Sequence, residues 1–262
     1  MLDHAVDSVY FFHIPKTGGT TVYSFLDQTF PTSQICPWGL WDQLITVERS
    51  ALDQWRVFRG HFLSHLQLYL DRPLTIFTLL RDPVARTVSH YCHVKRHPEH
   101  PSHVYAQSLT LGEFCVHPKT RHMVENYQAN YLAKSPCNPT QEGQGLSAEE
   151  RARFKLQERL QFPDTFRDAS ALLASAEARL STFHLVGFLE EFDKTLVEIS
   201  RKLDCPAVQM LSRDNVNPEP MSVDDLDDAT LSRIRALTEV DQRLYDSAIS
   251  AFKARSRSRI CQ

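Results

Sequence analysis

Three short runs of apolar residues mark the chain, and each is followed by a segment with helical periodicity. The runs are Ser8 to Ile14, Leu74 to Leu80 and Phe183 to Phe188. They are continuous rather than alternating, which is typical of strands buried on both faces of a sheet. Strands that alternate with helices predict an α/β fold, in which a central parallel sheet is flanked by helices on both faces.

The helical segments are indicated by apolar stripes and by residues that start or stop helices. Apolar residues recur at helical spacing from Val22 to Phe30, and Pro31 ends that pattern. After the second run, Asp82 is suited to cap a helix and Pro83 to be its first residue. A third helix is expected from about Glu190 to Leu203, and an additional short strand from Trp55 to Phe58.

Two regions depart from this rhythm. Residues His93 to Gly145 are rich in His, Pro and Asn, with helical pieces around Phe114 and from Met123 to Leu132, and we interpret them as an insertion beside the ligand-binding edge of the sheet. The segment from Ser222 onward predicts a long C-terminal helix, whose basic end (residues 253–262) is expected to be frayed. Its apolar stripe comprises Leu226, Leu237, Val240, Leu244, Ala248 and Phe252. Because there is neither a repeat nor a linker, residues 1–262 are predicted to form one domain.

Composition and net charge limit the kinds of ligand that the chain is expected to bind. The chain has 262 residues and a formal net charge of −3, which argues against a general nucleic-acid partner. A phosphate-rich ligand would therefore need a local basic site.

No stretch is long and apolar enough to span a membrane, and the first residues do not resemble a signal peptide. Six scattered cysteines without a C-x-x-C pair are typical of reduced thiols, so the expected location is cytoplasmic.

The most informative segment is Pro15-Lys16-Thr17-Gly18-Gly19-Thr20-Thr21, between the first strand and its helix. Glycines at such a junction let the backbone approach an anion, while the helix N-terminus offers N–H donors and a partial positive charge. The lysine adds a full charge and the threonines add hydroxyl donors. An ordinary turn with a solvated lysine is the alternative. The coincidence of these residue types at one strand–helix junction favours an anion site.

The order of residues in this loop distinguishes it from a Walker A loop. A Walker A loop places its lysine after the glycines and holds Mg²⁺ partly through the following hydroxyl residue. Here Lys16 precedes Gly18 and Gly19. An ordinary nucleoside triphosphatase is therefore disfavoured, although a P-loop-type kinase remains an alternative.

A second candidate anion site follows the second strand, in Arg81-Asp82-Pro83-Val84-Ala85-Arg86-Thr87-Val88-Ser89-His90-Tyr91. Arg81 stands at the carboxyl end of the strand, which is the usual ligand edge of a parallel sheet. Helical periodicity places Asp82, Arg86, Ser89 and His93 on one face and Val84, Val88 and Tyr91 on the other, where the apolar three are expected to pack on the sheet. The alternative is a capped helix in which Asp82 and Arg86 pair with each other.

Together the two motifs resemble the nucleotide-binding loops of sulfotransferases that use 3′-phosphoadenosine 5′-phosphosulfate (PAPS), a family whose fold is related to that of P-loop kinases. The resemblance implies that Lys16 contacts the oxygen bridging phosphate and sulfuryl group, and that the loop from Thr17 through Gly18, Gly19 and Thr20 to Thr21 holds the 5′-phosphate. It also implies that Arg81 and Ser89 bind the 3′-phosphate, and it requires no metal.

A weaker similarity continues into later segments of the chain. Val186 to Glu191 and Arg213 to Asn217 look like the later strand and the C-terminal loop of the same family. In that interpretation Arg213 closes over the nucleotide. The alternative for the second segment is an exposed polar turn.

The catalytic base is expected to be a histidine, because the acceptor hydroxyl must lose its proton as its oxygen attacks sulfur. His61 is the best candidate, in a Phe58-Arg59-Gly60-His61-Phe62 segment that resembles the Gly-His segment of the uronyl and heparan-sulfate 2-O-sulfotransferase branch. Gly60 is expected to let the backbone approach the ligand edge. His65 is the reserve candidate, and a structural histidine is the alternative.

The histidine-rich segment after the second motif has two interpretations. Because Pro98 and Pro101 interrupt its helix and no zinc-ligand pattern appears, metal binding is disfavoured. The alternative is that some of its side chains, with Lys95, Arg96 and Arg121, face an anionic acceptor. The histidines are His90, His93, His97, His100 and His103.

The sequence thus leads to one hypothesis and two rivals. The hypothesis is an enzyme that transfers a sulfuryl group from PAPS to a hydroxyl of a carbohydrate or another alcohol, with an anionic glycan as one possible acceptor. A P-loop-type nucleotide kinase and a non-catalytic nucleotide-binding protein are the rivals.

Overall fold

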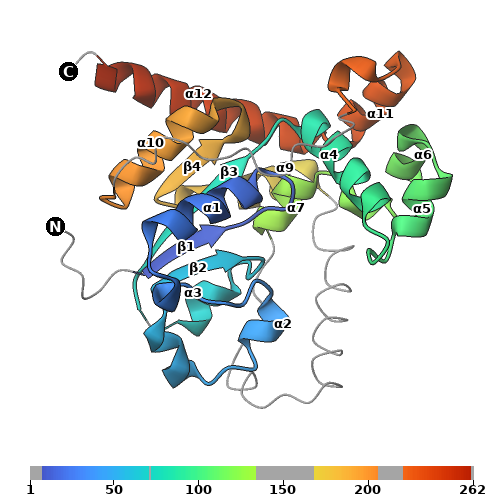
Figure 1. Cartoon of the computed structure of the whole chain (residues 1–262). Coiled ribbons are helices and arrows are strands. Elements are labelled where there is room, and N and C mark those ends of the chain that lie inside the picture. Colours follow the sequence, from blue (N-terminus) through green and yellow to red (C-terminus); the bar gives the residue numbers. More distant parts are fainter. Residues whose placement is uncertain (1–7, 71, 134–167, 206–220, 261–262) are drawn as a thin grey trace.

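Four parallel strands form one sheet at the centre of the computed structural model (Figure 1). The structure describes residues 8–70, 72–133, 168–205 and 221–260. The strands are β1 (Ser8–Phe12), β2 (Val57–Gly60), β3 (Leu74–Leu80) and β4 (Leu185–Phe188), in the order β2-β1-β3-β4. The expected α/β class with a parallel sheet flanked by helices is confirmed, and β2 begins two residues later than expected.

Helices connect the strands and supply most of the remaining described structure. Those that precede β3 are α1 (Gly19–Thr29), η1 (Thr32–Gln34), α2 (Trp41–Leu44), η2 (Arg49–Gln54) and α3 (His65–Tyr69). Those between β3 and β4 are α4 (Pro83–Arg96), α5 (His103–Ser108), α6 (Leu111–Val116), η3 (Arg121–Met123), α7 (Tyr127–Ala133) and α9 (Ala169–Ser181). After β4 come η4 (Leu189–Glu191), α10 (Phe192–Lys202), η5 (Val223–Asp225), α11 (Asp228–Leu237) and α12 (Glu239–Ile260).

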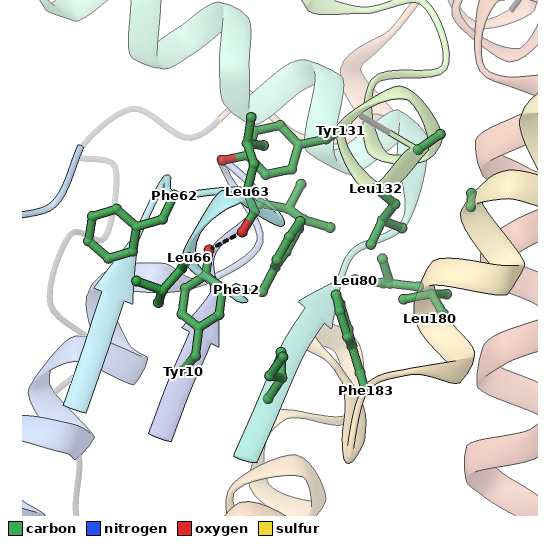
Figure 2. Close-up of a cluster of buried hydrophobic side chains, with 14 of the residues drawn as sticks. Tyr10, Phe12, Phe62, Leu63, Leu66, Leu80, Tyr131, Leu132, Leu180 and Phe183 are labelled. Atoms are coloured by element: carbon green, nitrogen blue, oxygen red, sulfur yellow. Dashed lines mark hydrogen bonds between the residues drawn. The ribbon is translucent and has the colours of Figure 1, made fainter. Parts of the chain in front are cut away.

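Strand β1 is buried on both faces, which explains its unbroken apolar sequence. Successive side chains of a strand point to opposite faces. Val9 and Phe11 pack in the core formed with α1 and α10. Tyr10 and Phe12 pack in the opposite core, with residues of α3, α7, α9 and α12. Figure 2 shows this second core, in which the Tyr10 hydroxyl donates a hydrogen bond of 2.9 Å to the carbonyl of Leu63.

Helix α4 belongs to a third apolar cluster, which lies beside the sheet rather than on it. Val84, Val88 and Tyr91 pack against residues of α5, α6 and α11. The expectation that these three side chains pack on the sheet is therefore wrong. Helical periodicity identified the buried face of α4, but it carries no information about which element covers that face.

The beginning and end of α4 follow the sequence signals. The Asp82 carboxylate accepts a hydrogen bond of 2.8 Å from the Ala85 amide, and Pro83 is the first helical residue. The helix ends at Arg96, before Pro98. This result matches the rule that the residue before a proline leaves the helical region.

The C-terminal segment forms two helices, because the chain breaks between α11 and α12 at Thr238. Leu226 and Leu237 pack in the cluster around α4, whereas Val240, Leu244 and Phe252 pack against the sheet core. One apolar stripe therefore serves two separate cores. Helix α12 is 22 residues long and runs through Ile260, so the backbone of residues 253–260, expected to be frayed, is helical.

The insertion from His93 is helical and leads back to the sheet through α7. Asp241, buried at the start of α12, accepts hydrogen bonds from the amides of Gln128 (3.1 Å) and Ala129 (2.7 Å). Amides in the first turn of a helix have no intrahelical acceptor, so this carboxylate satisfies two of them in α7. Residues 134–145 of the expected insertion lie outside the described residues.

We expect Asp241→Ala to lower the free energy of unfolding by about 1–3 kcal/mol, because two buried amides lose their acceptor. Asp246→Ala is the matched control, since Asp246 is exposed on the same helix and bonds only the Gln242 side chain among the described residues. Urea unfolding followed by circular dichroism measures both. Equal losses in the two variants would contradict this role for Asp241.

Candidate functional site

The loops that follow β1 and β3 meet at one edge of the sheet. β1 and β3 are neighbours and parallel, so both loops leave the same edge. In the order β2-β1-β3-β4, the chain moves to one side of β1 and then returns to the other, which makes the gap between the ends of β1 and β3 a topological switch point. Ligands of open α/β sheets bind in that position. The predicted anion loops therefore lie where the sheet topology favours a ligand.

The first loop has a special backbone at two positions. Gly18 has φ 94° and caps α1, a left-handed conformation that glycine adopts without strain. Lys16 also has a positive φ of 72°, which is uncommon for a residue with a side chain. The buried Thr17 hydroxyl donates to the Ile14 carbonyl at 2.8 Å. Thr17 therefore stabilises the turn through its hydroxyl.

Gly19 is required by a neighbouring side chain. A Cβ atom at this position would lie 2.1 Å from Nε2 of His13, so the imidazole occupies the space that any larger residue would need. The sequence interpretation attributed the glycines to close approach of an anion. For Gly19, the described structure supplies a different reason, which is close packing of the His13 ring.

Arg81 joins the two loops directly. Its guanidinium donates a hydrogen bond of 3.2 Å to the carbonyl of Lys16. Its backbone is held by Gln128 of α7, which accepts from the Arg81 amide (3.1 Å) and donates to the Arg81 carbonyl (2.8 Å). The Glu190 carboxylate, which follows β4, accepts from the Asp82 amide at 2.9 Å. The end of β3 is thus fixed by α7 and by the segment after β4.

Arg86 is buried beneath the first loop and does not pair with Asp82 as one interpretation of the sequence expected. Its guanidinium donates to the carbonyls of Pro15 (3.2 Å) and Met123 (2.5 Å) and lies 3.6 Å from the ring centroid of Tyr127. Asp82 instead caps its own helix. A buried guanidinium needs several acceptors, and backbone carbonyls from two segments provide them better than one carboxylate already used as a cap.

The site holds several cationic groups, and burial and three arginines lower the pKa of Lys16, while Cys92 acts in the opposite direction. Burial, followed by the charges of Arg96, Arg81 and Arg86, lowers the pKa of Lys16 to about 8. Within the described chain, Lys16 forms no ion pair with a carboxylate. Like charges near one another raise the free energy of the empty site, and this repulsion is offset in part by Glu190 and Asp82, which act on Arg81, and by Asp241, which acts on Arg86. A bound anion would reverse that effect.

His61 stands one residue after β2 and faces the same region. Its Nδ1 lies 2.9 Å from the carbonyl oxygen of His13 and 3.1 Å from the hydroxyl of Tyr131, and its ring stacks on that of His13 with centroids 4.5 Å apart. A carbonyl can only accept, so Nδ1 carries the proton and Nε2 is the basic nitrogen of the neutral ring. This tautomer is the one that a general base acting through Nε2 requires.

The remaining predicted residues occupy different positions. His65, the reserve base, is 1% exposed in α3, with its ring 5.0 Å from that of Trp41, so it is a core residue. Thr20 is exposed and Thr21 half-buried in the first turn of α1, and Ser89 is half-buried on α4. Arg213 lies outside the described residues, so its predicted role is not addressed by the structure.

Gly60 is required by the close approach of another backbone segment. A Cβ atom there would lie 2.3 Å from the carbonyl oxygen of Gly39, so the close approach is between two backbone segments. The amide of His61 donates to the same carbonyl at 2.8 Å. Gly60 therefore lets the chain around residue 39 come close enough to position His61.

Sequence reasoning missed two residues that shape the site, His13 and Tyr131. His13 stacks between Phe11 and His61, and burial, His61 and Lys16 lower its pKa well below the ordinary value. Tyr131 reaches His61 from α7, at the top of the core in Figure 2. His90, which the sequence analysis placed in the histidine-rich segment, lies buried on α4 beside Tyr127. The only available signal was the position of His13 at the end of an apolar strand, immediately before the anion loop.

Neither a scan against protein-family models nor a search of curated proteins found a match to this chain. No described helix is both long and apolar enough to cross a membrane. Among the residues that the structure describes, no three His, Cys, Asp or Glu side chains are arranged to hold a metal ion.

We expect His61 to populate the Nδ1–H tautomer at neutral pH, because the His13 carbonyl accepts from that nitrogen. Long-range ¹H–¹⁵N correlation spectra of histidine-labelled protein measure the tautomer. Tyr131→Phe should leave it unchanged, since the carbonyl remains. A predominant Nε2–H form of His61 would contradict the arrangement described above.

Proposed function

We propose that this protein is a sulfotransferase that moves a sulfuryl group from PAPS to an acceptor hydroxyl. The observation that carries the proposal is the meeting of two basic loops at the β1–β3 switch point, where Arg81 bonds the carbonyl of Lys16. Both loops resemble nucleotide-binding loops of PAPS-dependent enzymes. A donor with several anionic groups is the kind of ligand that would neutralise the charge gathered there.

The proposed binding mode assigns each loop one end of the nucleotide. The loop from Lys16 to Thr21 and the first turn of α1 receive the 5′-phosphosulfate, because amides in the first turn of a helix have no intrahelical acceptor. Arg81 and Ser89 receive the 3′-phosphate. Two loops at neighbouring strand ends can then hold one ligand across the switch point.

The proposed transfer is in line and requires two protein groups. Nε2 of His61 takes the proton of the acceptor hydroxyl while that oxygen forms a bond to sulfur. The bond between sulfur and the phosphate oxygen breaks, and its electron pair leaves with adenosine 3′,5′-bisphosphate. The ammonium of Lys16 stabilises the charge that develops on the departing phosphate. The proton ends on His61, the sulfuryl group on the acceptor, and no metal is required by this scheme.

The described carboxylates near this region favour PAPS over a Mg²⁺–nucleotide as the donor. Phosphoryl transfer by P-loop enzymes uses Mg²⁺ held partly by an acidic side chain. The carboxylates that act on Arg81 are those of Glu190 and Asp82. Asp82 accepts from the Ala85 amide, and Glu190 accepts from the Asp82 amide and from the Tyr245 hydroxyl. Both carboxylates therefore already accept hydrogen bonds that stabilise the fold.

Calorimetry with adenosine 3′,5′-bisphosphate and with ATP tests the donor class. We expect the bisphosphate to bind without metal and more tightly than ATP, with or without Mg²⁺. Arg81→Ala should weaken the bisphosphate by about tenfold or more, but weaken adenosine 5′-phosphate much less, because only the former carries a 3′-phosphate. Mg²⁺-dependent binding of ATP in preference to the bisphosphate would instead support a kinase.

Kinetics of His61→Ala test the chemical step. We expect turnover of radiolabelled PAPS with an acceptor found by screening alcohols and sugars to fall about 10²–10⁴-fold, because the general base is lost. Affinity for the bisphosphate should stay the same. His65→Ala is the comparison, expected to lower stability because its ring packs in the core. Bisphosphate binding with no acceptor ever sulfated would identify a non-catalytic nucleotide-binding protein.

A further inference from the structure

Three histidine rings form a triangle beside the first anion loop. His90 and His93 come from α4, and His100 from the segment that follows it. Their ring centroids are 6.4 Å apart (His90–His93), 6.2 Å apart (His90–His100) and 6.4 Å apart (His93–His100). His93 and His100 are half-buried, whereas His90 is 7% exposed. The two outer rings therefore stand over a buried one.

The buried ring has no hydrogen-bond partner. Both nitrogens of His90 are fully buried and unpaired, and Nη2 of Arg86, one turn earlier on α4, is also buried and unpaired. A buried polar group that lacks a partner costs about 1–3 kcal/mol. Two such groups side by side, one of them a cationic donor, indicate a place where acceptor atoms are missing.

The groups around the triangle are predominantly basic. Lys16 acts on it from the first loop, and Arg86 and Arg96 belong to α4. The ring of His97 is tilted against that of His93, with centroids 3.9 Å apart. Tyr127 of α7 lies 6.0 Å from His90. His97, Glu99 and His103, its neighbours along the chain, act on His100. Glu99 is the one acidic group among these neighbours.

We propose that His90, His93 and His100, together with Arg96, form an oxyanion-binding subsite next to Lys16. The subsite takes a carboxylate, sulfate or phosphate group, whose oxygens supply the acceptors that the buried donors lack. Its existence does not depend on PAPS chemistry. The oxyanion is either a second anionic group of the nucleotide or an acidic group of the acceptor. This choice between sources rests on the proposed function.

Charge distinguishes an oxyanion from a metal ion as the occupant. A cation placed among these rings would be repelled by Lys16, Arg86 and Arg96, and no described carboxylate apart from Glu99 acts on the triangle to offset that repulsion. An oxyanion would be attracted by the same three groups. The histidines can then add N–H donors by taking up protons.

Protonation should accompany binding. Burial and the charge of Lys16 lower the pKa of His93 to about 4, and burial lowers the pKa of His90 and His100 as well. The empty triangle is therefore neutral at pH 7. A bound oxyanion favours the protonated rings and raises their pKa, so binding takes up protons and the affinity rises as the pH falls. Lys16, with a pKa of about 8, stays protonated below pH 7 and does not contribute to this rise.

Inorganic sulfate is the probe for the test, because it keeps both charges over this pH range, whereas a phosphate monoester titrates near pH 6. Calorimetry between about pH 7 and about pH 5.5, in buffers of different ionisation enthalpy, measures sulfate affinity and proton uptake together. We expect affinity to rise toward acidic pH with uptake of at least a fraction of a proton.

Two variants and two matched controls locate the site. His93→Gln and Arg96→Gln should each weaken sulfate roughly tenfold, and His93→Gln should also reduce proton uptake. The controls are His117→Gln, whose Nδ1 accepts from the Lys119 amide at 3.2 Å, and Lys95→Gln, an exposed charge that lies over the Tyr91 ring. Both controls should leave sulfate binding unchanged. Thermal unfolding shows whether each variant remains folded.

Equal sulfate affinity in His93→Gln, Arg96→Gln and the two controls would overturn the subsite. Binding of Zn²⁺ that depends on His93, without any such loss of sulfate binding, would replace it with a metal site. Measuring sulfate binding in the presence of saturating adenosine 3′,5′-bisphosphate distinguishes the two sources. If sulfate still binds, the subsite belongs to the acceptor. If the bisphosphate competes with sulfate in the unchanged protein but not in His93→Gln, the subsite belongs to the nucleotide. If the bisphosphate does not bind at all, the proposed function fails, while the sulfate comparison still decides the subsite.

Discussion

The site depends on positive charge that the fold holds in place through hydrogen bonds to backbone carbonyls rather than through direct ion pairs. Arg81 donates to the Lys16 carbonyl, and Arg86 supports the same loop from below through the Pro15 carbonyl. Backbone carbonyls fix both guanidinium groups without cancelling their charge. Carboxylates in these positions would have formed internal ion pairs and left little attraction for a ligand. The arrangement therefore keeps its electrostatic free energy available for an anion.

Burying cations near one another is costly, and the structure limits this cost in two ways. The pKa of Lys16 is lowered to about 8, so part of the repulsion can be relieved by loss of a proton in mildly basic solution. Two of the α4 side chains on which Lys16 acts, His90 and His93, are histidines, which are neutral at pH 7 when their pKa is lowered by burial. Histidines thus let the empty protein avoid additional charge, while they can still provide charge when an anion arrives.

The elements of the sheet and the helix starts were predictable because they depend on local pattern. Continuous apolar runs marked β1 and β3, and Asp82-Pro83 marked the start of α4. The parts that were not predictable depend on contacts between distant segments. Nothing near Gly19 in the sequence reveals that its missing side chain makes room for His13, and nothing near Arg86 reveals the carbonyl of Met123 or the ring of Tyr127. The apolar face of α4 was identified correctly, but its partners come from α5, α6 and α11, far along the chain.

The way in which His61 is held fits the same electrostatic constraint. Many catalytic histidines are oriented by a carboxylate, which also stabilises the protonated ring. Here the carbonyl of His13 accepts from Nδ1, and Tyr131 lies at the same nitrogen. A carbonyl selects the tautomer as a carboxylate would, but it brings no formal negative charge into the proposed anion-binding region. The same loop segment that carries Lys16 thus also orients His61, so one short stretch after β1 links the anion site to the candidate base.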